Sequence, residues 1–167
     1  MTEVPRTAVI ALGANLGERE QTIRQAVAQI ESTEQIDVLA VSPLYETTAI
    51  TLDGPDPDKP GYLNGVALVT TTLDPETLLD VLEGIERAHG RERTERWGDR
   101  TLDLDIVDFG GLTRDSDRLT LPHPRAAERD FVLRPWLDID PDAQLPGEGR
   151  VAELLARLDR SGSDRDR

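Results

Sequence analysis

Hydrophobic and polar positions follow two periods along this chain, and each period predicts one type of element. A short apolar run at 7–12, TAVIAL, is typical of a buried strand. From about Glu18 to Ser32, apolar residues recur at positions i, i+3, i+4 and i+7, which predicts an amphipathic helix. The apolar face of that helix consists of Ile23, Ala26, Val27 and Ile30.

Extended structure is expected on both sides of a long loop. Residues 36–45 read as extended, because β-branched residues are frequent and the proline after Ser42 disfavours a helix there. The loop at 47–61 is rich in proline, glycine and aspartate and has no apolar periodicity. Loops of this length are usually functional or disordered. Residues 62–72, YLNGVALVTTT, predict a third strand.

A second helix and a fourth strand complete the pattern. Asp74 followed by Pro75 predicts a helix start, a capping side chain and then proline at the first helical position, and Gly90 is the expected end. Residues 102–106 alternate with period two, which predicts a strand over 101–109. The resulting order β-α-β-β-α-β predicts an α/β (α+β) fold of the ferredoxin-like type, with a mainly antiparallel sheet. The buried face of the second helix consists of Leu78, Leu79, Leu82 and Ile85.

The rest of the chain adds smaller elements to this core. A short strand-like segment at 119–122, LTLP, precedes a helical stretch around 125–134 and a helix at 151–159. We expect one domain over 1–160 and a polar, disordered tail at 161–167.

Composition and charge exclude several classes of protein. The net charge of −14 argues against a general nucleic-acid binder and against binding to anionic membranes. The chain has no cysteine, which excludes disulfides and thiolate metal sites. No apolar run reaches the length of a signal-peptide core or a membrane span. We therefore expect a cytoplasmic protein and a monomer.

The segment LDLDI places two carboxylates on one face of the fourth strand. Leu102, Leu104 and Ile106 share one face, and Asp103 and Asp105 share the other with Cα atoms about 7 Å apart. A water-exposed face is one interpretation. The other is a Mg²⁺ site, because paired carboxylates repel each other and Mg²⁺ takes one or two carboxylates together with substrate phosphates.

Arginines near this segment favour the metal–phosphate site. Of the 19 basic residues only Lys59 is a lysine, and five arginines fall between 87 and 100. The planar guanidinium group matches the geometry of phosphate oxygens, although a biased genome is another reason for an excess of arginine.

Other segments carry weaker signals. GANLG at 13–17 lacks the Lys-Ser/Thr of a phosphate-binding loop, so a tight turn with Asn15 as a helix cap is favoured. His123, between two prolines and close to arginines, is compatible with anion binding or with a structural role, whereas His89 at a helix end is expected to be structural. Core packing is one interpretation of Trp97, but its place inside the polar, arginine-rich loop favours the other, a flat ligand that stacks on aromatic rings.

The segment RWGDRTLDLDI, at 96–106, resembles the signature of the 6-hydroxymethyl-7,8-dihydropterin pyrophosphokinase family, usually written RWGPRTLDLDI. The resemblance extends to GANLG, to YLN at 62–64, to IERAHGRERTERW and to LTLPHPRAAERDFVL, in the order of the family and up to about residue 142. It implies a ferredoxin-like fold and a folate-pathway enzyme that moves pyrophosphate from ATP to the pterin hydroxymethyl group, leaving AMP.

The resemblance also implies roles for individual residues. Asp103 and Asp105 resemble ligands of two Mg²⁺ ions, and Arg91 and Arg100 resemble catalytic phosphate clamps. Residues around ATP and its phosphates are implied to be Glu86, Arg93, Arg96, Ile106, Arg118, Thr120, His123 and Arg129. Residues around the pterin are implied to be Thr47, Ile50, Tyr62, Asn64, Trp97 and Phe131.

The chain departs from the family pattern in its loops. The two prolines that often follow the threonine matching Thr47 are replaced by Thr48 and Ala49, so we expect this loop to contact the pterin differently. The loop at 47–61 is longer than in compact members, and the arginine-rich loop is about one residue shorter, so the assignment of Arg93 is the least secure. Asp99 replaces the proline of the signature.

Two rival functions remain open on the residues alone. One is a ferredoxin-like module that senses a ligand without catalysis, which a fold by itself does not exclude. The other is a different Mg²⁺-dependent phosphotransferase or a nuclease, although the negative net charge disfavours nucleic acid.

Overall fold

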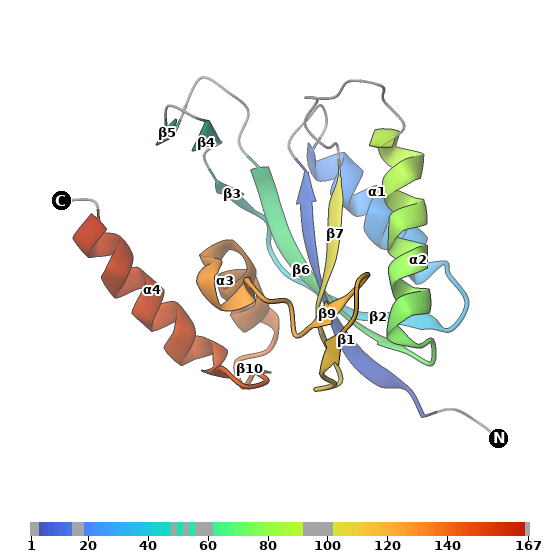
Figure 1. The fold of residues 1–167 in the computed structure, drawn as a ribbon. Helices are drawn as coiled ribbons and strands as arrows, with labels where there is room; N and C mark the ends of the chain where they lie inside the picture. Colours follow the sequence, from blue (N-terminus) through green and yellow to red (C-terminus); the bar gives the residue numbers. More distant parts are fainter. Residues whose placement is uncertain are drawn as a thin grey trace.

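The computed structural model of the protein contains an antiparallel sheet between two helical layers (Figure 1). α1 and α2 cover one face of the sheet, α3 covers the other, and α4 packs against α3 on that side. The predicted order β-α-β-β-α-β is confirmed. The structure describes residues 4–14, 19–47, 50–51, 54–55, 62–91 and 102–165.

The main sheet has the ferredoxin-like strand order β2-β6-β1-β7. β1 (Arg6–Ala14) and β6 (Tyr62–Thr71) are central, with β2 (Ile36–Val41) beside β6 and β7 (Asp103–Phe109) beside β1. Every neighbouring pair is antiparallel, because α1 and α2 each cross the sheet between strands that run the same way. β3 (Tyr45–Thr47) also pairs with β6, so the single extended segment expected there forms two strands.

Four α-helices and several short elements surround this sheet. The helices are α1 (Arg19–Glu31), α2 (Pro75–Glu86), α3 (Asp130–Ile139) and α4 (Val151–Arg165). The short strands are β4 (Ile50–Thr51), β5 (Gly54–Pro55), β8 (Arg114–Asp115), β9 (Thr120–Leu121), β10 (Gln144–Leu145) and β11 (Gly149–Arg150). None of the helices in the described ranges combines the length and the apolar character needed to cross a membrane.

Alternation along the strands divides the apolar side chains between two cores. Ile10 of β1 packs with Ile23 of α1 and Leu82 of α2, whereas Val9 packs on the opposite face with Trp136 of α3. All five side chains are at most 3% exposed. Burying such a side chain contributes about 1.5–3 kcal/mol, so both helical layers are held mainly by apolar burial.

α2 begins as its sequence predicts and ends differently. The Asp74 carboxylate accepts a hydrogen bond from the Thr77 amide at 2.7 Å, which caps the helix and lowers the pKa of Asp74. After Glu86 the chain forms a π-helical turn, Arg87–Arg91, so the helical backbone passes the glycine that was expected to end it. His89 in this turn lies 2.7 Å from the Gln29 side chain of α1, which is the structural role expected for it.

The helices after β7 differ from their predicted bounds. A 3₁₀ turn, Ala126–Glu128, precedes α3, and α3 continues past Pro135 to Ile139. Pro135 removes one helical hydrogen bond, but it is buried in the helix, where packing onto the sheet opposes that loss. α4 runs to Arg165, which brings helical backbone into the segment expected to be a tail.

Candidate functional site

The strand register aligns polar residues in a row across one end of the main sheet. Tyr45 of β3 lies opposite Asn64 of β6, Asn64 lies opposite Gly13 of β1, and Gly13 lies opposite Asp103 of β7. Since neighbouring strands are about 4.8 Å apart, Asn64 and Asp103 are separated by about 10 Å across the sheet. Gly13, between them on β1, has no side chain and is itself buried.

The two aspartates of β7 lie on the face of the sheet that carries α3 and α4. Leu104 and Ile106 are 3% and 2% exposed in the core formed with α1 and α2, so the alternating Asp103 and Asp105 point to the opposite face. Leu102 is also buried in that core, which confirms the predicted apolar face. Asp103 is half-buried and Asp105 is exposed, so this pair is accessible to a ligand.

Glu86 fixes the end of α2 against this part of β7. Its side chain is buried, and its Oε2 accepts a hydrogen bond from the Leu104 amide at 2.9 Å. Leu104 lies between Asp103 and Asp105, so the buried carboxylate holds the backbone from which both aspartates project. Buried polar groups are nearly always paired in this way, because an unpaired buried group costs about 1–3 kcal/mol.

His123 lies along β7 beside the aspartates. Its amide donates to the Val107 carbonyl at 2.8 Å, and its Nδ1 accepts from the Arg125 amide at 3.2 Å. With Nδ1 as acceptor, the neutral ring carries its proton on Nε2. Burial lowers the pKa of His123, the charges of Arg129 and Arg125 lower it further, and the Asp105 carboxylate opposes them. The ring is therefore neutral at pH 7 and close to the aspartates.

Arg129 and Phe131 stand at the start of α3. The Arg129 guanidinium lies 5.6 Å from the centre of the Phe131 ring, a cation–π contact between two half-buried side chains. Arg129 also influences the pKa of His123, so its charge belongs to the same cluster as His123 and Asp105. A guanidinium here adds to the positive end of the α3 dipole and favours a bound anion.

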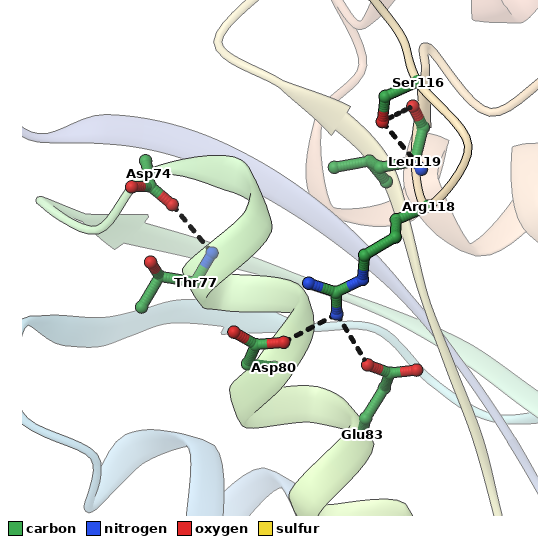
Figure 2. A network of polar contacts seen from close by, with 7 residues as sticks. All are labelled: Asp74, Thr77, Asp80, Glu83, Ser116, Arg118 and Leu119. Atoms are coloured by element: carbon green, nitrogen blue, oxygen red, sulfur yellow. Dashed lines mark hydrogen bonds and ion pairs between the residues drawn. The ribbon is translucent and has the colours of Figure 1, made fainter.

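Arg118 lies with α2 instead of with this cluster. Figure 2 shows its guanidinium between Asp80 at 2.6 Å and Glu83 at 2.9 Å, two carboxylates on the exposed side of α2. These partners raise the pKa of Arg118, with Asp80 as the larger cause. The turn that carries Arg118 is closed by Ser116, whose hydroxyl bonds to the backbone of Leu119 at 3.1 Å. The arginine thus joins the β8–β9 hairpin to α2, one helical turn before Glu86.

The structure brings together part of the predicted site. The cluster around the end of β7 contains Asp103, Asp105, Glu86, His123, Arg129 and Phe131, and Asn64 lies two strands away. Ile106 is buried in the core with α2, and Thr120 is exposed on β9. For Arg91, Thr47, Ile50 and Tyr62 the structure describes the backbone. Arg93, Arg96, Trp97 and Arg100, like the expected cap Asn15, lie outside the described residues.

A contact that the sequence did not indicate joins two parts of the site region. The hydroxyl of Tyr45 on β3 bonds to the carboxylate of Asp138 on α3, across 93 residues of sequence. No motif or periodicity relates residues so far apart. The pairing follows only from the placement of α3 on the face of β6.

The chain matches known proteins over nearly its whole length. It matches the family model described as 7,8-dihydro-6-hydroxymethylpterin-pyrophosphokinase over residues 9–141. It is 44% identical over 156 residues to the 2-amino-4-hydroxy-6-hydroxymethyldihydropteridine pyrophosphokinase of Pseudomonas aeruginosa, covering 93% of this chain and 94% of that protein. The protein of the same name from Haemophilus influenzae is 39% identical over 152 residues, covering 91% and 92%.

Solved structures show the same fold. A crystal structure of wild-type Plasmodium falciparum HPPK-DHPS with pteroate superposes with a TM-score of 0.74 at 14% identity. The superposition covers all of this chain and 45% of that one, so the chain spans about half the length of that protein.

Proposed function

Since the chain belongs to the 7,8-dihydro-6-hydroxymethylpterin-pyrophosphokinase family, we propose that it transfers pyrophosphate from ATP to 6-hydroxymethyl-7,8-dihydropterin at the end of β7. Membership makes the chain a pyrophosphokinase of folate synthesis, and the non-catalytic module and the nuclease are set aside. One observation carries the placement of the site. Two accessible carboxylates share a face with a neutral histidine and an arginine beside them.

The carboxylates suit magnesium as the metal that accompanies ATP. No group of three or more acidic or histidine side chains in the described ranges could hold a metal ion alone. Mg²⁺ commonly takes one or two carboxylates and completes its shell with phosphate oxygens and water, which fits the pair Asp103 and Asp105. When bound there, two Mg²⁺ ions would neutralise phosphate charge and lower the pKa of the attacking hydroxyl.

The reaction requires one bond to form and one to break. The hydroxymethyl oxygen of the pterin bonds to the β-phosphorus of ATP, the bond from that phosphorus to the oxygen bridging to the α-phosphorus breaks, and AMP leaves with that oxygen. The hydroxyl proton is released to solvent. Such a transfer depends on positioning and charge neutralisation more than on covalent chemistry by the protein.

The residues of the cluster have separate tasks in this proposal. His123 donates its Nε2 proton in a hydrogen bond to a phosphate oxygen, and Arg129 adds positive charge beside it. Arg91 and Arg100 clamp the transferred group, as the resemblance implies. The resemblance implies further nucleotide contacts by Glu86, Arg93, Arg96, Ile106, Arg118 and Thr120. Of these, Ile106 is buried in the core with α2, and Arg118 is bonded to Asp80 and Glu83 of α2.

The pterin is proposed to lie between β6 and α3. The resemblance assigns a pterin hydrogen bond to Asn64, which is buried at the end of β6, and stacking to the ring of Phe131 at the start of α3. The remaining contacts implied by the resemblance are Thr47, Ile50, Tyr62 and Trp97. A cytoplasmic location and a monomeric state stay predictions.

Product analysis tests this function directly. The purified protein is incubated with Mg²⁺, ATP and 6-hydroxymethyl-7,8-dihydropterin, and the products are separated by chromatography and identified by ³¹P NMR. We expect AMP and the pterin diphosphate in equal amounts, and no product when a chelator removes the metal. ADP as the product, or undiminished turnover in chelator, would contradict the proposal.

A further inference from the structure

The bond between Tyr45 and Asp138 joins two elements that the proposed site uses for the pterin. Tyr45 begins β3, a three-residue strand at the edge of the sheet, and Asp138 lies in the last turn of α3. The tyrosine hydroxyl donates to Oδ2 of the aspartate. Tyr45 is half-buried and Asp138 is exposed, so the bond between strand and helix lies at the surface.

On the strand side, the bond lies in β3, directly before the loop at 47–61. β3 ends at Thr47, where the chain enters the loop at 47–61, and the backbone of Thr47 pairs with Tyr62. Tyr45 itself pairs with Asn64. Three pairs of residues hold this short strand, so a side-chain anchor at its first residue limits how far the strand and the loop entry can shift.

On the helix side, the bond acts on the element that carries Phe131. Asp138 follows Phe131 by seven residues, about two helical turns, so both project from the same side of α3. Apolar packing of Leu133 and Trp136 holds α3 on the sheet, but such packing is not directional. A hydrogen bond from the strand sets the position of the helix along its axis more narrowly.

We propose that Tyr45 and Asp138 are a positioning pair for the pterin, which keeps Thr47, the last residue of β3, at a fixed place relative to Phe131 on α3. This inference rests on the proposed function. The pair touches neither substrate in this proposal. It increases the fraction of molecules in which the two sides of the pterin site are correctly spaced, and apparent affinity falls in proportion to that fraction when the bond is lost.

The electrostatics of the pair keep the tyrosine protonated. The hydrogen bond to Asp138 raises the pKa of Tyr45, with burial and the Asp138 charge adding to it and Arg134 opposing it. Tyr45 is therefore a hydrogen-bond donor throughout the neutral range. The Arg134 guanidinium forms an ion pair with Asp159 of α4 at 2.8 Å, and this ion pair does not involve β3.

The test compares Tyr45→Phe with the matched control Asp159→Asn, which breaks an exposed contact of the same helix. Fluorescence titration measures binding of 6-hydroxymethyl-7,8-dihydropterin in the presence of Mg²⁺ and a non-hydrolysable ATP analogue, and steady-state kinetics give KM for each substrate. We expect Tyr45→Phe to weaken pterin binding about three- to tenfold, with the KM for ATP unchanged. Asp159→Asn should bind pterin like the wild type.

Variants of Asp138 separate positioning from general destabilisation. Asp138→Ala should match Tyr45→Phe, the double variant should be no worse than either single one, and Asp138→Asn should retain most of the affinity. A second readout is the ultraviolet titration of the chain's two tyrosines. The tyrosine signal that disappears in Tyr45→Phe belongs to Tyr45, and its pKa should lie above the ordinary value for tyrosine. In Asp138→Ala the pKa of Tyr45 should fall back toward that ordinary value.

Three results would overturn the inference: pterin affinity unchanged in Tyr45→Phe, an equal loss of affinity for ATP, or additive effects in the double variant. Failure of the proposed function is distinguishable, because it would appear as wild-type protein that forms no AMP and pterin diphosphate. Wild-type turnover with an unaltered Tyr45→Phe would contradict only the positioning role.

Discussion

At the scale of single residues, the environment of His123 decides how it can act. Burial and two arginines favour its neutral form, whereas Asp105 favours its charged form. A neutral ring with Nδ1 occupied by the Arg125 amide can donate only from Nε2. A neutral donor binds a phosphate oxygen without adding a full charge beside the proposed metal site.

The titration of His123, in protein free of Mg²⁺ and ATP, tests whether burial and the two arginines outweigh Asp105 in setting its pKa. The chain has two histidines, so ¹H NMR of their imidazole protons resolves His123 once Asn substitution of either assigns the signals. We expect a midpoint below the ordinary 6.5, and a still lower midpoint in Asp105→Asn, because that variant removes the one charge that raises the pKa. A lowered pKa in the folded state also means that this contribution to stability is complete above pH 6.5 and is lost as the pH falls through the folded-state pKa.

A midpoint above 6.5, or an upward movement in Asp105→Asn, would contradict the described environment. The first outcome would place His123 closer to a carboxylate than to the arginines, and the second would mean that the Asp105 charge does not raise the pKa of the ring.

Sequence alone could predict the aspartate pair but not which residues from later in the chain surround it. Period-two alternation in LDLDI requires Asp103 and Asp105 to share a face, and the buried leucines confirm it. His123 and Arg129 lie near Asp105 in space but follow it by 18 and 24 residues in the sequence. They come close because the segment after β9 runs back along β7. Propensity and spacing carry no information about such a return.

At the scale of elements, the contact between α2 and β7 prepares the site. α2 is capped by Asp74 at its start and ends at Glu86, whose side chain binds the Leu104 amide. The helix therefore spans the sheet face from a cap at one end to a buried carboxylate at the other. Its second task is to hold β7 at the point from which both aspartates project.

Removal of the Glu86 carboxylate should reduce stability more than removal of an exposed carboxylate on the same helix. Glu86→Ala leaves the Leu104 amide unpaired, which should lower the free energy of unfolding by about 1–3 kcal/mol in urea titrations. Glu86→Gln keeps an acceptor oxygen and should lose less. The matched control is Glu83→Ala, which breaks a solvent-exposed ion pair with Arg118 and should change stability little.

Equal stability of Glu86→Ala and Glu83→Ala would contradict the role of the buried carboxylate. It would mean that the Leu104 amide finds another partner in the variant.

At the scale of the whole molecule, the topology was predictable because it rests on local periodicity. Apolar spacing identified the strands and helices of the ferredoxin-like core, and the buried residues of α1 and α2 include most of those expected. The helices after β7 were less predictable. Pro135 is a strong local signal against a helix interior, yet burial against the sheet keeps α3 intact through Ile139.

The two faces of the sheet differ in the side chains that they carry. The face covered by α1 and α2 is filled with apolar side chains from end to end. The face covered by α3 and α4 is apolar under α3 and carries Asn64, Asp103 and Asp105 at its end. The register of four strands brings this polar end together, where Asp105 is exposed, Asp103 is half-buried and Asn64 is buried.

The most direct test of the Asp103–Asp105 site is the turnover of Asp105→Asn beside Asp108→Asn with saturating Mg²⁺, ATP and pterin. Asp108 lies three residues along the same strand and is half-buried, and burial raises its pKa, so its substitution by Asn keeps the size of the side chain at a neighbouring carboxylate outside the pair. We predict that Asp105→Asn loses at least about 100-fold in kcat with an unchanged circular dichroism spectrum, and that Asp108→Asn stays near the wild type. Near-wild-type turnover of Asp105→Asn would contradict the site.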